Sequence, residues 1–401
     1  MRIFIQLRTR QPRFYLALHT YRATRPMPKF LHTADWQIGK QFGGFDPDDA
    51  ALLAKARIDG IRAIAELAAA EHVDGVLVPG DVFDAQMVAD KTIQQAFRAM
   101  EPYPGPWLLL PGNHDAGLIE SVWTRAQRLG AVPANVVLCL TPTPVSLLDG
   151  RVVVLPAPLN QRNTFADLTE WFDHAATDPG VIRIGLAHGS AQGVLHDGID
   201  SANPIAAGRA DSARIDYLAL GDWHGTAQID AKTWYSGTHE QDRFRGNDPG
   251  NVLIVEIEAG LAPRVRPVRI GRHRWQQIEV VLQVASDIEA LEATLETLSA
   301  PDVVDLTVTG AVDLASHERL QRAVSRAQGR VLALRWDLAG LQLLPSPEDI
   351  ASLRADGYLA DAIDELRTAQ TLGGDAGDLA RDSLILLATT MRGVNTVGAA
   401  A

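Results

Sequence analysis

Short apolar runs and longer amphipathic stretches alternate along the first half of the chain. Residues 48–70 and 91–100 carry apolar side chains at the three- and four-residue intervals of a helix that buries one face. Apolar runs short enough for buried strands lie at 29–34, 75–79, 107–110, 181–187 and 217–220. This alternation predicts an α/β domain of layered sheets, with helices flanking the sheets.

The pattern changes near residue 270. Five arginines form a basic strip between residues 264 and 274. Strands and helices then follow in the order β-α-β-α-β between 278 and 336, and two helical stretches come last. We therefore expect four segments: an extension at 1–26, a main domain at 27–270, a small α+β domain at 271–345, and C-terminal helices with a tail at 346–401.

Five of the predicted strands end in side chains that can bind a metal ion. In chain order these are Asp35 with Gln37, Asp81, Asn113 with His114 and Asp115, His188, and Asp222 with His224. In an open α/β sheet, the loops beyond the carboxyl ends of the strands form the active site. The five strand ends are therefore expected to converge on one point.

The ligand types indicate which metal chemistry to expect. Carboxylate, amide oxygen and imidazole without thiolate suit Mn²⁺ best, with Mg²⁺, Fe or Zn²⁺ as alternatives. Two such ions about 3.5–4 Å apart can clamp the attacking and leaving oxygens of a phosphoryl displacement. A carboxylate can bridge the pair, and a hydroxide held between the ions would be the nucleophile.

The strand-end motifs resemble the signature of calcineurin-like metallophosphoesterases: in order they are D-x-Q, G-D-x-x-D, G-N-H-D, G-x-x-H and G-D-x-H. Within that superfamily the chain is most similar to bacterial DNA-repair exonucleases of the SbcD type, because HTADW at 32–36 and YSGT at 235–238 also resemble that group. The resemblance implies a sandwich-like metallophosphoesterase fold. The small domain and the C-terminal helices match the group's capping domain and partner-binding tail by position alone.

The resemblance also implies a role for each motif residue. Asp81 would bridge both ions. The first ion would have three further ligands: Asp35, Gln37 and His224. The second ion would also have three: Asn113, His188 and Asp222. His114 would stand near the leaving group as a proton donor or phosphate-orienting cation, and Asp115 would orient His114 through a hydrogen bond.

Two of these positions depart from the family pattern, which usually has His at both. Asp222 remains a good ligand for a hard ion, and its charge favours Mn²⁺ or Mg²⁺. Gln37 offers only a neutral carbonyl oxygen. The first site is therefore expected to be weaker, or to fill only with substrate phosphate, and a non-catalytic site is the alternative.

Three aromatic side chains near the motifs have two interpretations each. Trp36 and Trp223 adjoin proposed ligands, where they could stack on a base or sugar of the substrate or simply pack and stiffen the site. His239 could touch substrate or lie in a surface loop. The arginine strip at 264–274 could guide a DNA backbone or form a solvated face.

Composition and charge limit the possible functions. Of 401 residues, 46% are hydrophobic and 21% charged, as in an ordinary globular protein. The formal net charge is −12, and residues 1–26 carry six arginines with no acid, so the remaining chain is more acidic still. An acidic body repels a polyanion, so bound cations, a basic strip or a partner would have to offset that repulsion.

The cysteine count and hydropathy suggest where the protein works. A single cysteine, Cys139, excludes an intramolecular disulfide and a Cys-based zinc site, which suits the cytoplasm. No apolar run reaches the ~18 residues of a membrane span. We interpret 1–26 as a non-native or disordered extension, with the natural start at Met27.

These observations favour a two-metal-dependent phosphodiester hydrolase. The resemblance implies a DNA exonuclease or endonuclease in repair, with a coiled-coil ATPase partner of the SbcC/SMC-like or AAA type and a possible dimer. A small-nucleotide phosphodiesterase or phosphatase is the alternative, and a non-catalytic scaffold with a weakened metal site is a second. The residues after 270 suit a large substrate, whereas the acidic surface argues against one.

Overall fold

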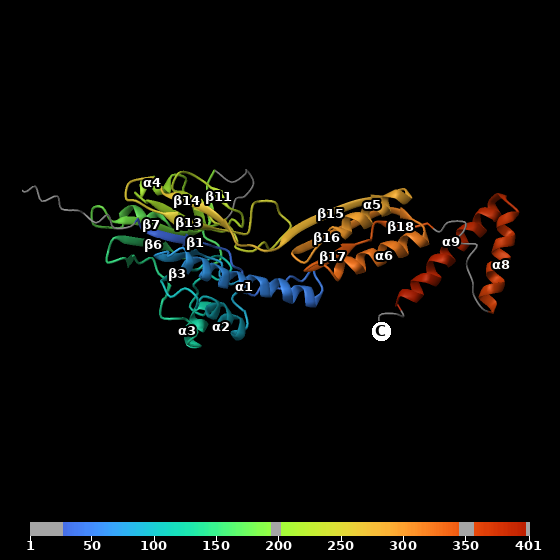
Figure 1. Cartoon of the computed structure of the whole chain (residues 1–401), viewed down its shortest axis with the longest axis horizontal. Helices are drawn as coiled ribbons and strands as arrows, with labels where there is room; N and C mark the ends of the chain where they lie inside the picture. The colour runs from blue at the N-terminus through green and yellow to red at the C-terminus, as the bar shows by residue number, and fades with distance from the viewer. Residues whose placement is uncertain (1–26, 194–201, 345–356, 398–401) are drawn as a thin grey trace, which may run out of the picture.

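The computed structural model describes residues 27–193, 202–344 and 357–397. The chain forms a part with two six-stranded sheets, a smaller part with a four-stranded sheet, and the helices α8 (Tyr358–Thr371) and α9 (Gly374–Val397). These parts follow one another along the long axis (Figure 1). The predicted extension at 1–26 lies outside the described residues.

The first sheet carries the ends of the first three strands predicted from the sequence. Its strand order is β14-β13-β1-β2-β3-β4. The strands are β1 (Lys29–His32), β2 (Gly75–Pro79), β3 (Trp107–Leu110), β4 (Val136–Leu138), β13 (Asn251–Glu256) and β14 (Arg264–Arg269). Strands β1 to β4 are mutually parallel, so their carboxyl ends lie at one edge of the sheet.

The second sheet carries the other two strand ends, and its order is β11-β12-β10-β7-β6-β5. The strands are β5 (Val145–Leu147), β6 (Val152–Ala157), β7 (Ile182–His188), β10 (Tyr217–Gly221), β11 (Ala227–Gln228) and β12 (Thr233–Tyr235). A small two-stranded sheet of β8 (Ser190–Ala191) and β9 (Pro204–Ile205) follows β7. Because β6, β7, β10 and β12 are parallel, His188 and Asp222 come to one edge.

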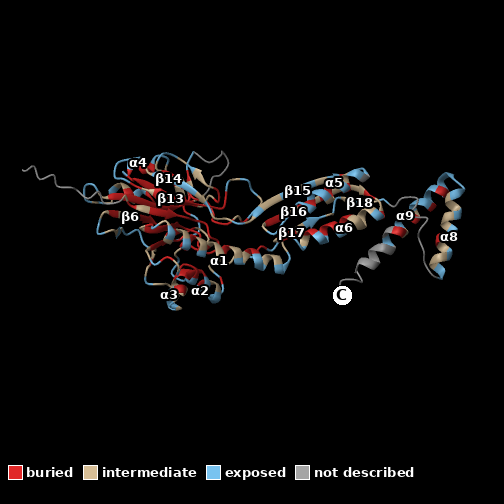
Figure 2. Ribbon diagram, in the orientation of Figure 1, coloured by how far each residue is buried: buried red, intermediate tan, exposed pale blue. Residues whose placement is uncertain are grey.

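The two sheets pack face to face, with helices on both outer faces. The core between them takes Phe30, Leu77 and Leu108 from the first sheet, and Val154, Ile184 and Tyr217 from the second. Three helices pack on the outer face of the first sheet: α1 (Pro47–Ala70), α2 (Asp90–Ala99) and α3 (Val122–Arg128). The short η1 (Glu170–His174) and α4 (Arg209–Ser212) cover the second sheet. The expected layered α/β fold is confirmed, and buried residues concentrate in these strands (Figure 2).

The third sheet forms a separate small core. Its elements are β15 (Arg274–Leu282), α5 (Ala285–Glu296), β16 (Asp302–Val312), α6 (Leu314–Gln328), β17 (Ala333–Asp337) and β18 (Leu341–Leu343). The order β-α-β-α-β agrees with the sequence pattern, and the strands run parallel. This sheet packs on the start of α1 through a shared apolar cluster that includes Leu53, Val303 and Ala333.

Two further helices close the described chain. They are α8 (Tyr358–Thr371) and α9 (Gly374–Val397), and they pack on each other through Ile363 and Leu384. Gly373 and Gly374 separate them in left-handed conformations, with φ of 70° and 65°. Across the described ranges, every helix is too short or too polar to span a bilayer.

His32 ends β1 and lies fully buried between the two large sheets. Its Nδ1 is 2.8 Å from the Tyr217 hydroxyl, and its Nε2 is 3.2 Å from the Leu220 carbonyl oxygen. Burial lowers the pKa of His32 to about 3, although the contact with the Leu220 carbonyl opposes the shift. The imidazole is therefore neutral in the folded protein at any pH near neutrality.

Acidification should destabilise the fold through His32. The unfolded chain binds this proton below pH 6.5 and the folded chain only near pH 3, so the stability is present above pH 6.5 and falls as the pH drops. We expect a loss of about 2 kcal/mol in the free energy of unfolding between pH 7 and pH 5. Urea unfolding in EDTA at the two pH values measures this loss. In His32→Gln the loss should be smaller by about 2 kcal/mol. An equal loss in the wild-type protein and in His32→Gln would contradict the neutral, buried state of His32.

Candidate metal centre

The strand ends adopt a backbone conformation that side-chain-bearing residues rarely use. Asp35, Gln37 and Asp81 have φ of 53°, 45° and 52°, and Asp222 has φ of 103°. Such conformations cost about 1–3 kcal/mol each and persist only where surrounding contacts enforce them. Here the Asp35 N–H donates to the Gly80 carbonyl at 3.2 Å, and the Gln37 N–H donates to the Asp81 carbonyl at 2.8 Å. The ends of β1 and β2 therefore hold each other in place.

Two glycines allow these strand ends to approach one another. A Cβ atom at Gly112 would lie 2.2 Å from Asp81 Oδ1, and one at Gly80 would lie 2.1 Å from His188 Nδ1. Gly80 also has a φ of 91°. The glycines that precede Asp81 and Asn113 are thus required by close packing around Asp81.

A buried imidazole and two buried carboxylates meet at the centre of the site. Ligand atoms of Asp35, Asp81 and His188 all lie within 4.8 Å of one another. The Nε2 atom of His188 is 3.1 Å from Asn113 Oδ1, 3.5 Å from Asp81 Oδ1 and 3.7 Å from Asp222 Oδ1. Four of the predicted ligands therefore present donor atoms to the same small volume.

The electrostatics of this cluster fit a bound cation. Burial by itself would lower the pKa of His188, but Asp81, Asp222 and Asp35 outweigh it and raise the pKa to about 9. The Nδ1 atom of His188 is 2.9 Å from the Pro79 carbonyl oxygen. With Nδ1 protonated, Nε2 can release its proton to solvent and bind a metal ion, which would neutralise the same carboxylates.

Asp35 supplies the clearest sign that a cation belongs in the site. Its Oδ1 accepts a hydrogen bond from the Asp222 N–H at 3.0 Å, whereas its Oδ2 is buried without a hydrogen-bond partner. Burial raises the pKa of Asp35 to about 6, against the lowering effects of His224 and His188. A buried oxygen without a donor is costly, and a metal ion would satisfy it. The residues of this site therefore fit a divalent metal ion.

The predicted ligand His224 is held by Asp242, a residue that the sequence pattern missed. The Nδ1 atom of His224 lies 3.0 Å from Asp242 Oδ1. Burial would raise the pKa of Asp242, but His224, Arg57 and Lys40 outweigh it and hold the pKa well below its usual range. The ionised carboxylate fixes the ring tautomer. Nε2 lies 3.0 Å from the Arg243 guanidinium, which a cation bound at Nε2 would displace. Asp242 lies in an irregular loop, and its only sequence signal was its place shortly after the YSGT motif.

A second missed residue is Arg57 of α1, which is buried beneath the end of β1. Its guanidinium donates to the Asp35 carbonyl at 2.9 Å and the Trp36 carbonyl at 2.6 Å. It also donates to the Thr238 hydroxyl at 2.8 Å and the Glu240 carbonyl at 2.8 Å. The available signal was an arginine on the apolar face of the predicted helix, four residues before Ile61.

Gln37 meets Asp81 through its amide nitrogen. Its Nε2 donates to Asp81 Oδ2 at 3.1 Å, and the side chain is 2% exposed. Asp81 Oδ1 accepts from the His114 N–H at 2.9 Å. In this arrangement Gln37 positions the central carboxylate, and coordination through its oxygen stays a prediction.

The prediction that Asp115 orients His114 through a hydrogen bond is wrong. Asp115 is fully buried and accepts from two backbone groups, the Gly112 N–H at 2.7 Å and the Phe83 N–H at 3.0 Å. His114 Nδ1 instead lies 2.8 Å from the Asp84 carbonyl oxygen. Buried backbone N–H groups need acceptors, and Asp115 satisfies two of them where β2 and β3 end.

Residues 28–226 match the family model described as calcineurin-like phosphoesterase. The chain carries a calcineurin-like phosphoesterase domain. The predicted ligands lie within residues 28–226, whereas Asp242 lies beyond the matched range.

The phosphoesterase domain is similar to two proteins named as repair or nuclease components. The chain is 28% identical over 283 residues to the DNA double-strand break repair protein Mre11 of Aeropyrum pernix, covering 63% of this chain and 64% of that protein. It is 35% identical over 94 residues to the D subunit of the nuclease SbcCD of Rhodobacter capsulatus, covering 22% of this chain and 21% of that one. The chain thus spans less than two thirds of either relative.

Solved structures with detectable likeness are distant. TT1561 of Thermus thermophilus aligns with a TM-score of 0.39 at 12% identity, covering 61% of this chain and 99% of that chain. The purple acid phosphatase PPD1 of yellow lupin (Lupinus luteus) seeds aligns with a TM-score of 0.37 at 15% identity, covering 59% and 50%. Similarities at this level carry no argument about the site.

Two of the three proposed substrate contacts lie inside the phosphoesterase core. Trp36 is fully buried, and its Nε1 donates to the Thr33 hydroxyl at 3.0 Å. His239 is fully buried too: its Nε2 faces the Arg57 carbonyl at 2.8 Å, and its ring lies where a side chain at Gly60 would be. The structure does not support substrate contact by Trp36 or His239. Trp223 is half-buried, and the Arg245 guanidinium lies 4.9 Å from its ring centroid.

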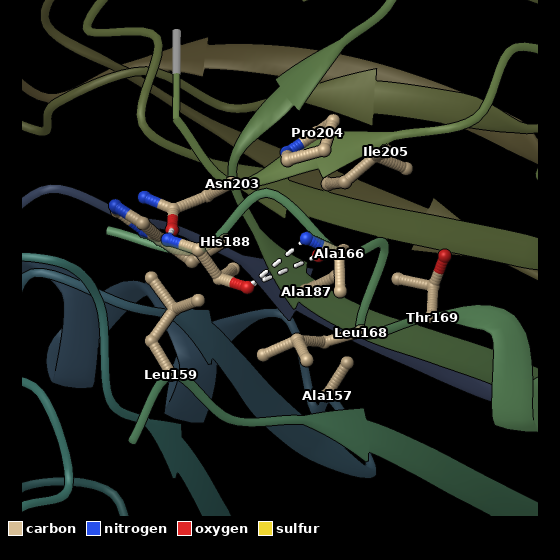
Figure 3. Close-up of a pocket in the computed structure, with 11 residues that line it drawn as sticks. Ala157, Leu159, Ala166, Leu168, Thr169, Ala187, His188, Asn203, Pro204 and Ile205 are labelled. Atoms are coloured by element: carbon tan, nitrogen blue, oxygen red, sulfur yellow. Dashed lines mark hydrogen bonds between the residues drawn. The ribbon is translucent and has the colours of Figure 1, made fainter. Parts of the chain in front are cut away.

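A small cavity beside His188 is too small to bind substrate. Its volume is about 10 Å³, and Ala157, Leu168 and Ile205 line it with His188 and Asn203 (Figure 3). A cavity of that size holds about one water molecule. Substrate must therefore reach the phosphoesterase site from outside this cavity, where residues such as Asn113 and Asp222 are partly exposed.

Replacing Arg57 should disturb the metal centre, although Arg57 is not itself one of the predicted ligands. Arg57→Lys keeps the charge but cannot satisfy four acceptors, so we expect a loss of about 2–4 kcal/mol in stability and about 10-fold or greater loss of Mn²⁺ affinity. Arg62→Lys, on the exposed side of α1, should change neither. Thermal unfolding measures the stability, and Mn²⁺ titration calorimetry measures the affinity. Unchanged Mn²⁺ affinity in Arg57→Lys would show that Arg57 does not position the metal centre.

Proposed function

We propose that this protein is a metal-dependent phosphodiester hydrolase that acts on DNA. The observation that carries the proposal is the buried cluster of Asp35, Asp81 and His188 at the strand ends of a calcineurin-like phosphoesterase domain. The unpartnered Asp35 Oδ2 supports a cation at this point. The two relatives named as a repair protein and a nuclease component support DNA as the substrate.

The ligands divide into two sets around Asp81. One set is proposed to comprise Asp35, His224 and, more weakly, Gln37. The other is proposed to comprise Asn113, His188 and Asp222. Support for the second set is the 3.1–3.7 Å spacing of its donor atoms from His188 Nε2. Support for the first is the orientation of His224 by Asp242.

Two divalent ions, when bound, would supply an acidified water near neutral pH and stabilise charge on the reacting phosphate. The oxygen-rich donor set favours Mn²⁺ or Mg²⁺ over soft metals. His114 has its Nδ1 at the Asp84 carbonyl, which leaves Nε2 to face a substrate. We assign His114 the task of donating a proton to the leaving oxygen or a hydrogen bond to the phosphate.

The parts outside the phosphoesterase domain favour DNA and a partner protein. The third sheet packs on α1 beside the site, where it can extend the surface for a long substrate. The helix pair α8–α9 exposes Leu372, Leu379 and Leu386, at 79%, 69% and 68%. Leu379 and Leu386 both lie on α9, seven residues apart, the spacing at which helices pair with other helices. A coiled-coil ATPase of the SbcC type is the proposed partner.

Hydrolysis of labelled DNA tests the proposal directly. With Mn²⁺ we expect cleavage of linear DNA that stops in EDTA, and a loss of about 100-fold or more in His114→Ala. His174→Ala, an exposed histidine on η1, is the matched control and should cleave normally. Cleavage of bis-p-nitrophenyl phosphate alone would favour the small-nucleotide alternative, and no hydrolysis with metal bound would favour the scaffold.

Gln37→His tests the proposed asymmetry between the two metal positions. Imidazole would replace an amide that now hydrogen-bonds Asp81, so the weaker of two Mn²⁺ equivalents should bind about 10-fold tighter, or roughly 1.4 kcal/mol. Gln41→His, on the exposed loop after it, should bind as the wild type does. Titration calorimetry with Mn²⁺ compares the two variants with the wild-type protein. Two sites of equal Mn²⁺ affinity in the wild-type protein would refute the asymmetry.

A further inference from the structure

Two adjoining hollows form one groove beside the metal centre. The first, of about 470 Å³, lies between the loop after β1 and the third sheet, and Phe244, Trp275 and Arg335 help to line it. The second, of about 970 Å³, continues along α1 towards α2, past Lys55 and Lys91. Both are lined by Lys40, Gly43 and Phe45. We call the two together the basic groove.

The basic groove begins at a proposed metal ligand. Arg243 lines its first hollow, and its Nη2 is 3.0 Å from His224 Nε2. Lys40, common to both hollows, binds Asp242 at 2.6 Å, and Asp242 holds His224. A chain that filled the groove would therefore reach the metal centre at its His224 side.

The charge of the basic groove is opposite to that of the whole chain. Its charged lining comprises Lys40, Lys55, Lys91, Arg243 and Arg335 against Asp59 and Asp242. Three of the five lysines in the sequence are among them. Both acids are ion-paired within the groove, Asp59 with Lys55 at 2.5 Å and Asp242 with Lys40 at 2.6 Å. In a protein of formal net charge −12, this concentration attracts an anion locally.

Lys91 has the most available charge of this set. It is exposed, and its side-chain amine makes no ion pair or hydrogen bond within the part of the chain that the structure describes. Pro47 and Ala50 in the first turn of α1 line the second hollow, but the acids of that turn, Asp48 and Asp49, line neither hollow. Asp49 accepts from the Leu334 N–H at 3.1 Å and so faces the third sheet.

Aromatic rings line the end of the basic groove that lies against the third sheet. Phe244 and Trp275 have ring centroids 4.8 Å apart, and Phe45 packs beside both. The Arg335 guanidinium lies 5.0 Å from the Phe244 centroid and 5.5 Å from that of Phe45. Rings next to cations form the kind of surface on which unpaired bases stack, whatever their sequence.

We propose that the basic groove binds a single strand of nucleic acid and leads it to the metal centre. The proposal rests on the proposed function and adds the substrate form. Phosphates would lie along Lys40, Lys55 and Lys91, and bases would stack at Phe45 and Phe244. A duplex keeps its base faces covered by stacking, so the aromatic end can serve only an unpaired strand.

Binding of fluorescein-labelled oligothymidine in EDTA tests the proposal without hydrolysis. Lys55→Glu/Lys91→Glu should weaken binding about 10-fold or more and flatten the log–log salt dependence by about 1.4, or 0.7 for each phosphate that is no longer neutralised. Lys232→Glu is the matched control: this lysine lies between β11 and β12, outside the groove, and pairs with Asp211. Oligothymidine affinity that is unchanged in the double variant, or equally weakened in Lys232→Glu, would overturn the proposal.

A second variant separates stacking from charge. Phe244→Leu keeps an apolar side chain against Trp275 but removes the ring face, so oligothymidine should bind about 5-fold more weakly or worse with an unchanged salt slope. Binding of a hairpin duplex without single-stranded ends should be unaffected by Phe244→Leu. Wild-type affinity for oligothymidine in this variant, or an equal loss for duplex, would overturn the stacking site.

Hydrolysis of bis-p-nitrophenyl phosphate with Mn²⁺ tests the proposed function separately from strand binding in the basic groove. It should be unchanged in the lysine and Phe244 variants, because the small diester needs no groove. If the wild-type protein hydrolyses neither the diester nor DNA, the proposed function fails while oligothymidine binding still reports on the groove. If the wild-type protein hydrolyses the diester normally and the lysine variant binds oligothymidine unchanged, the groove proposal is refuted and the proposed function is not.

Discussion

The buried guanidinium of Arg57 is the contact on which the site geometry depends. It ties α1 to the carbonyl groups of Asp35 and Trp36 at the end of β1, and to Thr238 and Glu240. Asp35 sits in a left-handed conformation just above it. Because Arg57 has five N–H donors in a rigid plane, it can satisfy these carbonyls at once where water cannot enter. Asp35, the first predicted ligand, thus takes its position from a helix that contains none of the predicted ligands.

Because negative charge is concentrated at the centre of the site, the folded arrangement of the carboxylates depends on a positive charge among them. Asp35, Asp81 and Asp222 lie around His188, and burial raises the pKa of Asp35 and Asp222. Bringing these carboxylates together is unfavourable unless a positive charge joins them. A protonated His188 supplies one such charge and a divalent ion supplies more. The same burial that opposes ionisation of the carboxylates therefore favours a cation bound between them.

The distribution of charge reconciles an acidic protein with the proposed polyanionic substrate. The arginine strip at 264–274 was one candidate for a DNA guide. The structure places much of it on β14, at the edge of the first sheet, where Arg266 pairs with Glu71. Three of the five lysines, by contrast, come from a loop and two helices and gather in the basic groove that runs to His224. Local concentration, rather than net charge, decides where an anion can approach.

The sequence by itself determined the layered α/β fold and most of the candidate site, because each apolar run ends in a ligand type and parallel strands end at one edge. The tertiary structure decided what local pattern cannot encode: that Asp115 bonds to backbone rather than to His114, and that Trp36 and His239 are core side chains. It also revealed Asp242 and Arg57, since their partners lie 18 or more residues away. Periodicity reports which face of an element is buried, whereas hydrogen-bond partners depend on how distant elements pack.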